Sequence, residues 1–230
     1  MWKEVILLNR TPLSQRKLPD YTRGEEHFNM ISHIVGGGIA IAGMVLCIIR
    51  AALHHNGYGV GSSIVFGVSM LFMYTMSSLY HGLRDGMAKR VLQVLDHCSI
   101  YVVIAGSYTP VLLSAMRPLD ARTSWILFYV VWGLAAAAIV LNSIDLHRWR
   151  RLSMALYIGM GWTIIVRLPL LLAAIGWGGF ALLLAGGICY TAGAVLYGKG
   201  KKRRWMHSVF HLFVVFGSIC HILAILLFAL

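Results

Sequence analysis

The chain has 230 residues, of which 59% are hydrophobic and only 12% are charged, and its mean hydropathy is +0.75. This composition excludes a protein whose main solvent is water and indicates an integral membrane protein. The formal net charge of +12 would also suit a nucleic-acid-binding protein, so the positions of the basic residues decide how it is interpreted.

Seven apolar runs follow one another along the chain, each with the roughly 20 residues that a bilayer-crossing α-helix needs. Short linkers rich in turn residues separate them, such as Asn56-Gly57 and Arg117-Pro118. We therefore predict an all-α membrane protein, a seven-transmembrane-helix bundle, with residues 1–26 as a tail and 27–230 as the membrane domain. The runs cover residues 29–50, 61–82, 91–114, 124–143, 152–173, 176–197 and 207–229.

The N-terminal tail has charges scattered through it and no small-residue cleavage site after an apolar core, so we do not expect a removable signal peptide. We expect a cytoplasmic segment that lies on the membrane surface through the apolar residues Val5, Ile6, Leu7 and Leu8.

Basic residues are distributed very unevenly between the two ends of the predicted spans. Sixteen of the 20 Lys and Arg residues fall on the tail or on the second, fourth and sixth loops. Because positively charged loops stay in the cytoplasm, this asymmetry places the N terminus inside and the C terminus outside. It also accounts for the net charge without a nucleic-acid partner, since basic loops attract anionic lipid headgroups. The four exceptions are Arg50, Arg117, Arg122 and Arg167.

Polar residues on three separate spans converge on the cytoplasmic side once the chain is threaded in this way. His81 lies at the end of the second span, with Ser77 one helical turn deeper on the same face. Asp96 lies within about two turns of the start of the third span. His207 and His211 begin the seventh span, and their spacing puts both imidazoles on one stripe. Ionisable groups at membrane depth need a partner or an ion, and a bound cation would supply one.

Three neutral imidazoles suit Zn²⁺, and three protein ligands leave the fourth tetrahedral position open for water, as in catalytic zinc sites. We predict His81, His207 and His211 as the zinc ligands. Asp96 is expected beside the open position, where it would accept a proton from the water or hold it by a hydrogen bond. Ser77 would bond a neighbouring group or an oxyanion on the substrate. The alternative is that the HxxxH spacing arose by chance and these histidines anchor a helix end at the membrane interface.

Three further histidines lie inside the predicted spans. His33 and His97 are candidates for a supporting partner or an alternative ligand, although hydrogen-bonded helix histidines are the commoner case. His221 is ten residues beyond His211, about 15 Å further along the helix axis, and so out of reach of the same ion. We expect it to bond within the bundle or to line a cavity.

Glycine, proline and cysteine positions add three structural predictions. The runs Gly36-Gly37-Gly38 and Gly186-Gly187 predict close helix packing rather than phosphate loops, because no strand precedes them. Pro110 is expected to kink the third span. The four cysteines lie inside spans without a CxxC spacing, which suits small buried side chains better than disulfides or a thiolate zinc site.

Short motifs on several spans accompany the candidate site. They are Glu25-Glu26-His27-Phe28-Asn29 before Ser32-His33, Ser77-Ser78-Leu79-Tyr80-His81, Leu95-Asp96-His97, Ala105-Gly106-Ser107-Tyr108-Thr109-Pro110, Gly159-Met160-Gly161-Trp162, and His207 to His221. With these motifs the chain resembles the bacterial hemolysin III family, over residues 24–230. That family is related to the progestin and adipoQ receptors and to the alkaline ceramidase-type membrane hydrolases. The resemblance implies seven helices and zinc held by His81, His207 and His211, with Asp96 and Ser77 close by.

Our leading functional prediction is a zinc-dependent hydrolase in the bacterial cytoplasmic (inner) membrane, acting on a lipid amide or ester at the inner leaflet. Its partners would be membrane lipids. The alternative is a non-enzymatic regulator of membrane lipid order, in which zinc has a structural role. A pore-forming cytolysin is less favoured, because the spans carry no stripe of charges to line a channel, and cation transport lacks an acidic relay in the outer half of the spans.

Overall fold

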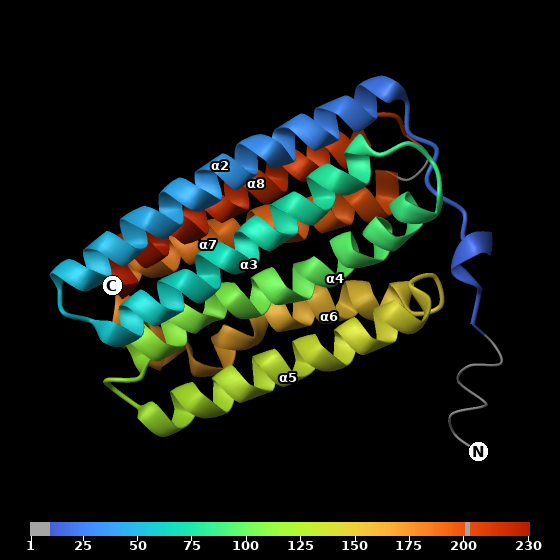
Figure 1. Ribbon diagram of the computed structural model, residues 1–230. Coiled ribbons are helices and arrows are strands. Elements are labelled where there is room, and N and C mark those ends of the chain that lie inside the picture. The colour runs from blue at the N-terminus through green and yellow to red at the C-terminus, as the bar shows by residue number, and fades with distance from the viewer. Residues whose placement is uncertain (1–9, 201–202) are drawn as a thin grey trace, which may run out of the picture.

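A computed structural model describes residues 10–200 and 203–230, and over these residues every regular element is a helix. The long helices lie side by side in one elongated bundle, with the N-terminal segment at one end and the last residue at the other (Figure 1). The membrane-surface prediction for Val5 to Leu8 lies outside the described residues. The elements are η1 (Leu13–Gln15), α2 (Arg23–Leu53), α3 (Gly57–Gly82), α4 (Met87–Pro110), η2 (Val111–Met116), α5 (Ala121–Asp145), α6 (Arg150–Trp162), η3 (Thr163–Arg167), α7 (Leu168–Gly200), α8 (Met206–Ala224) and η4 (Ile225–Ala229).

Six helical segments among the described residues are long and apolar enough to cross a membrane, so the prediction of a helical membrane bundle is confirmed at this level. The fifth segment, Arg150–Gly198, has 49 residues. A straight α-helix of that length would extend about 74 Å, more than twice the thickness of a bilayer's hydrocarbon core of about 30 Å.

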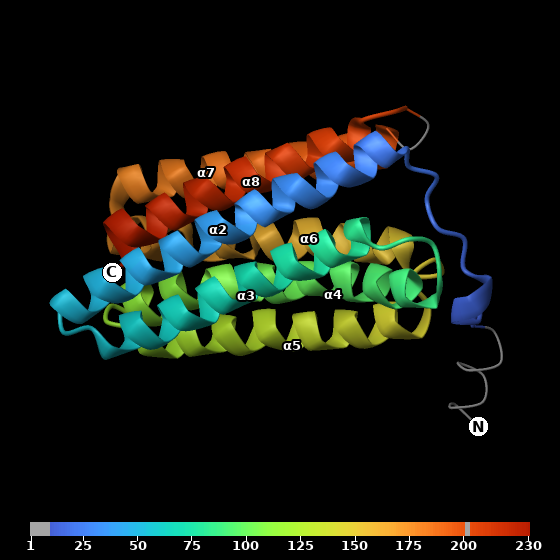
Figure 2. The ribbon, with the colours of Figure 1, turned by 45° about the horizontal axis from the view of Figure 1, so that its top comes forward.

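This fifth segment is not straight. Gly176 has φ 63° and ψ 180°, which interrupts the helix. The indole Nε1 of Trp162 donates a hydrogen bond to Thr191 Oγ1 at 3.1 Å, although the two residues are 29 positions apart. The chain therefore folds back between them, and α6 and α7 run as two separate rods in Figure 2. The break adjoins the linker that the sequence predicted between residues 173 and 176.

Side-chain caps explain where several helices begin. The Thr22 hydroxyl accepts from Glu25 N while the Glu25 carboxylate accepts from Thr22 N, a capping box that starts α2. Asn56 and Asp120 cap α3 and α5 by accepting from Gly59 N and Thr123 N. These caps satisfy amide groups that would otherwise be left without partners at the helix ends.

Glycines allow the helices to approach closely, as the sequence predicted. A Cβ atom on Gly36 would come within 2.4 Å of the Tyr74 ring, and one on Gly186 within 2.2 Å of His221. The Tyr74 hydroxyl donates to Ser218 Oγ at 2.8 Å, which ties α3 to α8 in the buried core. The face that packs these helices together is thus made of small residues that admit large aromatic rings.

The cysteines and Pro110 were the subjects of two other structural predictions. All four cysteines are free, as expected. At Pro110 the third span does not stop, because α4 continues directly into the π-helical turn η2, where Arg117 N bonds Leu112 O at 2.9 Å. The helix type thus changes directly after Pro110, and the kink that the sequence predicted there stays a prediction.

The N-terminal segment closes the end of the bundle where α3 ends and α4 and α8 begin. Arg90 Nε donates to Arg16 O at 3.0 Å, Thr11 N donates to Asp145 Oδ2 at 2.9 Å, and Trp205 N donates to Glu25 Oε1 at 2.6 Å. The first two bonds tie the start of α4 and the end of α5 to the N-terminal segment, and the third ties the start of α8 to the start of α2.

Candidate metal centre

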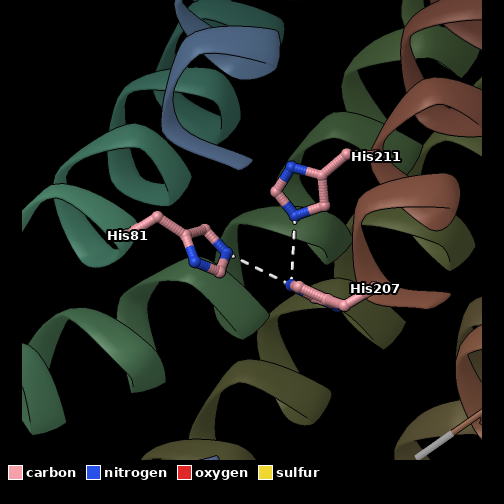
Figure 3. A group of neighbouring side chains, drawn as sticks. All are labelled: His81, His207 and His211. Atoms are coloured by element: carbon pink, nitrogen blue, oxygen red, sulfur yellow. Dashed lines mark hydrogen bonds between the residues drawn. The ribbon is translucent and has the colours of Figure 1, made fainter. Parts of the chain in front are cut away.

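Three histidines from two helices point toward one another at this end of the bundle (Figure 3). His81 comes from the last turn of α3, and His207 and His211 from the first turns of α8. His207 Nε2 lies 3.1 Å from His81 Nε2 and 3.1 Å from His211 Nε2. All three ligand atoms lie within 4.8 Å of one another. The structure therefore brings together the three residues that the sequence singled out as metal ligands.

The partly exposed carboxylate of Glu26 orients the first of these rings. Glu26 Oε2 is 2.5 Å from His81 Nδ1, and Glu26 Oε1 is 2.5 Å from Lys89 Nζ. Lys89 is 4% exposed and also donates to Leu83 O at 3.0 Å. An ionised carboxylate only accepts hydrogen bonds, so His81 Nδ1 is the donor and its Nε2 carries the lone pair in a neutral imidazole.

A serine orients the second ring in the same sense. Ser32 Oγ donates to Asn29 O at 2.9 Å, so its oxygen is left to accept from His211 Nδ1 at 3.4 Å. His211 Nε2 then also carries a lone pair and faces His207. Carboxylate and hydroxyl partners of this kind are the ones that fix the tautomer and the direction of metal-binding histidines.

The three imidazole nitrogens are better satisfied by a bound cation than by hydrogen bonds among themselves. If His207 Nε2 carries a hydrogen, it can donate to only one of its two neighbours. If Nδ1 carries it, that buried atom has no partner among the described residues, and three lone pairs face one another. Zn–N bonds of about 2.0–2.1 Å in a tetrahedron correspond to nitrogen separations of about 3.3 Å, close to the 3.1 Å found here. Zn²⁺ would satisfy all three nitrogens.

Ser77 and Asp96 lie beside the histidines and face a cavity. Both line a cavity of about 210 Å³ that also includes His207 and His211 in its wall. Neither residue belongs to the group of possible metal ligands. Their expected places beside the open metal position and their chemical roles stay predictions.

The cavity extends from the histidines into the middle of the bundle between α4, α6, α7 and α8. His221 is one of its lining residues and lies outside the three-histidine group, which is one of the two positions that the sequence predicted for it. Its wall is mainly apolar, with Ile104, Leu171, Phe180 and Leu183 among the lining residues. This shape and lining suit a hydrocarbon chain.

His33 and His97 do not join the three-histidine group. His33 is 3% exposed and stacks on the His211 ring, with 3.7 Å between ring centroids. His97 donates from Nδ1 to Gln93 O at 2.8 Å and lines the cavity. The sequence left open whether His33 and His97 are supporting partners or alternative ligands. The structure favours supporting or cavity-lining positions for both.

Tyr21 covers the metal centre from the side of the N-terminal segment. Its ring stacks on His207 with a centroid distance of 4.9 Å and an interplanar angle of 13°. It also lies 5.8 Å from the His81 ring. Burial raises the pKa of the Tyr21 hydroxyl, which therefore stays protonated. The side chain shields two of the three imidazoles from the aqueous end of the bundle.

Sequence reasoning assigned no role to Glu26, Lys89, Ser32 or Tyr21. The first helix carried one signal, because Asn29 and His33 follow Glu25 and Glu26 at intervals of three and four residues, but this spacing does not distinguish Glu26 from Glu25. Nothing in the sequence indicated that Tyr21, which precedes the helix, would stack on His207.

Comparison with known proteins identifies the family. Residues 21–222 match the family model described as Haemolysin-III related. The Hemolysin-3 homolog of Bacillus subtilis (strain 168) is 38% identical over 198 residues, 86% of this chain and 91% of the relative. Hemolysin-3 of Bacillus cereus is 37% identical over 206 residues, 90% and 92% of the two chains. The Heptahelical transmembrane protein ADIPOR2 of Oryza sativa subsp. japonica is 28% identical over 195 residues, 74% and 83%. The chain, a multi-pass helical membrane protein, therefore belongs to the haemolysin III family.

Proposed function

We propose that this protein is a zinc-dependent membrane hydrolase that cleaves a lipid amide or ester at the inner leaflet. The observation that carries the proposal is the junction of a three-imidazole cluster with an apolar cavity, at a point where Ser77 and Asp96 line the wall. A metal with only a structural role would not need an adjoining cavity of this chemistry.

Bound at the three imidazoles, Zn²⁺ would supply the Lewis acidity that activates water and polarises a carbonyl. The chain's own residues perform the remaining tasks. Asp96 accepts a proton as the water oxygen forms its bond to the carbonyl carbon, and returns it to the leaving nitrogen or oxygen as that bond breaks. Ser77 donates a hydrogen bond to the oxygen on which negative charge develops. The apolar cavity holds the acyl chain and excludes bulk water.

The threading of the chain supports the placement of this site near the inner leaflet. The two ends of the bundle carry the opposite termini, and the fifth long segment folds back on itself, which agrees with seven crossings. One of the relatives has the word heptahelical in its name. Basic loops flank the end with the histidines, so this end faces the cytoplasm, and we place the protein in the bacterial inner membrane.

The test is lipid turnover by purified, zinc-loaded protein on a panel of lipid amides and esters. Asp96→Asn and Ser77→Ala should each lower turnover by about 100-fold or more while zinc content stays at one ion per chain. Ser78→Ala is a matched control, because the Ser78 hydroxyl bonds Tyr74 O on its own helix. The proposal fails if zinc is bound and no lipid on the panel is cleaved.

A further inference from the structure

A second cavity, of about 310 Å³, lies where the N-terminal segment packs against the start of α4 and the end of α5. It shares no lining residue with the cavity at the metal centre. The N-terminal segment contributes Arg10 and Arg16 to its wall, and α4 contributes Val91 and Leu95. No acidic residue lines it. One side of the cavity is therefore basic and the other apolar.

Arg16 brings a buried positive charge to this wall. The residue is 5% exposed, and its Nε and Nη2 atoms donate to Thr11 O at 3.1 Å and Ile144 O at 2.7 Å. The remaining amino group, Nη1, has no hydrogen-bond partner among the described residues. Carbonyl oxygens accept hydrogen bonds but carry no net charge, so they leave the charge of a buried guanidinium without a counter-ion. An anion in the adjoining cavity would supply one.

Asp145 is bonded to the same segment but does not form an ion pair with Arg16 among the described residues. Its carboxylate accepts from Thr11 N at 2.9 Å and from the next two backbone amides but one, His147 N at 3.0 Å and Arg148 N at 3.1 Å. These bonds hold the carboxylate in place at the end of α5. The charge of Arg16 is thus left for a ligand to compensate.

Arg10 adds a second guanidinium that an anion can reach. Its side chain is exposed, and it forms no hydrogen bond or ion pair with another described residue. A guanidinium presents its N–H groups in a planar fork that matches the oxygens of a phosphate. Two arginines in one wall therefore favour a phosphate group as the ligand.

The apolar side of the cavity continues onto the outer face of α4. Val91 is 42% exposed and Leu95 is 38% exposed, and their spacing of four residues places them on one stripe of the helix. Exposed apolar side chains on a membrane-spanning helix contact lipid acyl chains. A molecule with its phosphate at the arginines can thus lay a hydrocarbon chain along this stripe.

We propose that this cavity binds the phosphate of an anionic phospholipid through Arg10 and Arg16, with an acyl chain along Val91 and Leu95. The inference is independent of the proposed hydrolase, because the two cavities are separate. Basic pockets at the ends of membrane helices are suited to lipid headgroups of this kind. Zwitterionic phospholipids share the phosphate but bring a cation into a wall that already carries two positive charges. The site should therefore prefer anionic lipids.

Native mass spectrometry of the delipidated full chain tests this, with phosphatidylglycerol and phosphatidylethanolamine of the same acyl chains as probes. We expect the wild-type protein to bind its first phosphatidylglycerol about tenfold more tightly than phosphatidylethanolamine. Arg10→Gln and Arg16→Gln should each lower the affinity for phosphatidylglycerol by about five- to tenfold, because each loses a charge-assisted hydrogen bond. Lys17→Gln removes the same charge from an exposed neighbour outside the cavity wall and should change the affinity by less than about twofold.

Arg16→Gln also loses the bonds to Thr11 O and Ile144 O, so the thermal stability of each variant is measured and Arg10→Gln decides the result. Equal affinity for the two lipids, or the same loss in Lys17→Gln as in Arg10→Gln, would show attraction to the overall positive charge and overturn the inference.

Soluble phosphates separate a lipid headgroup from a free anion. Inorganic phosphate and glycerol 3-phosphate, at millimolar concentration, should leave bound phosphatidylglycerol in place, because they lack the acyl chain that contacts Val91 and Leu95. If either displaces the lipid from the wild-type protein, the cavity recognises phosphate alone and its assignment to a phospholipid is wrong.

Discussion

His81 shows at the scale of one residue how a metal ligand is prepared by its neighbours. Its side chain is fully covered, one ring nitrogen faces Glu26, and the other faces His207. Glu26 is in turn held by Lys89, which is buried as well. A buried lysine and glutamate compensate each other's charge, and this pair leaves one carboxylate oxygen free for the histidine.

Replacing Glu26 tests whether this support matters for the metal. Glu26→Gln keeps the size of the side chain but removes the charge that accepts from His81 Nδ1 and pairs with Lys89. We expect zinc affinity to fall by about 10- to 100-fold, the usual effect of losing such a partner. Competition with a calibrated zinc chelator measures it.

Glu25→Gln is the matched control for this substitution. Its carboxylate bonds Thr22 and Trp205 N and lies outside the histidine cluster, so zinc affinity should stay within about twofold of the wild-type value. Wild-type zinc affinity in Glu26→Gln would show that the carboxylate has no part in holding the metal.

The contrast between His81 and Glu26 shows how far sequence reasoning reaches at this scale. His81, His207 and His211 could be predicted because imidazoles are rare at membrane depth and the basic loops place all three at one end. Glu26 could not be separated from Glu25 in the same way. Both begin the first helix, and only the packing of α2 against α3 decides which carboxylate reaches His81.

At the scale of elements, α2 and α3 pack closely only because particular positions lack a side chain. Gly36 faces the Tyr74 ring, which is fully buried and held by Ser218. Gly38, two positions on, has open space beyond its Cα. The same helix thus offers one glycine that packing requires and one that it does not.

Gly36→Ala should therefore destabilise the protein, by about 1–3 kcal/mol, because a rigid aromatic ring must move to admit the methyl group. Gly38→Ala should be neutral or stabilising by up to about 1 kcal/mol, as alanine favours a helix. Unfolding in a mild detergent with added denaturant measures both. Equal stability of the two variants would mean that α2 shifts freely against α3.

The N-terminal segment also acts as an element, since it places Tyr21 over His207. Tyr21→Ala should increase the rate at which a chelator removes zinc by several-fold, because two imidazoles lose their cover. Tyr21→Phe keeps the stacked ring and should lose zinc at the wild-type rate. Stopped-flow or manual chelator exchange gives both rates. A slow, unchanged exchange in Tyr21→Ala would contradict a covering role.

The helix boundaries show what an apolar pattern can and cannot specify. Runs of hydrophobic residues located each long helix, since burial in lipid imposes their length. A break between residues 173 and 176 was also predicted from the apolar runs, and the structure places it at Gly176, whose positive φ glycine tolerates. The end of α6 at Trp162 was not predicted. The last carbonyl groups of this helix, at Met160 and Gly161, accept from the hydroxyl of Tyr108 on α4, and such a contact between helices cannot be read from an apolar pattern.

For the whole molecule, the decisive question is how often residues 150–198 cross the membrane. A single crossing would put Arg148 and Arg203 on opposite sides, whereas a fold-back at Gly176 puts both on the side of the histidines. The bond between Trp162 and Thr191 supports the second arrangement. The distribution of basic residues agrees with it, because both loops are then cytoplasmic.

Cysteine labelling in intact cells tests this arrangement on a background in which the four native cysteines are replaced. Trp177→Cys, at a side chain 73% exposed beside the fold-back, should react with a membrane-impermeant maleimide from outside. Arg203→Cys should react only after the cells are permeabilised, because the basic residues predict that its end of the bundle faces the cytoplasm. His54→Cys, in the connection between α2 and α3, and Ala88→Cys, in the exposed first turn of α4, mark the expected outer and inner sides. The arrangement would be contradicted if Arg203→Cys were labelled in intact cells while His54→Cys was labelled and Ala88→Cys was protected. Residues 150–198 would then cross the membrane only once, and His207 and His211 would not lie on the same side as His81.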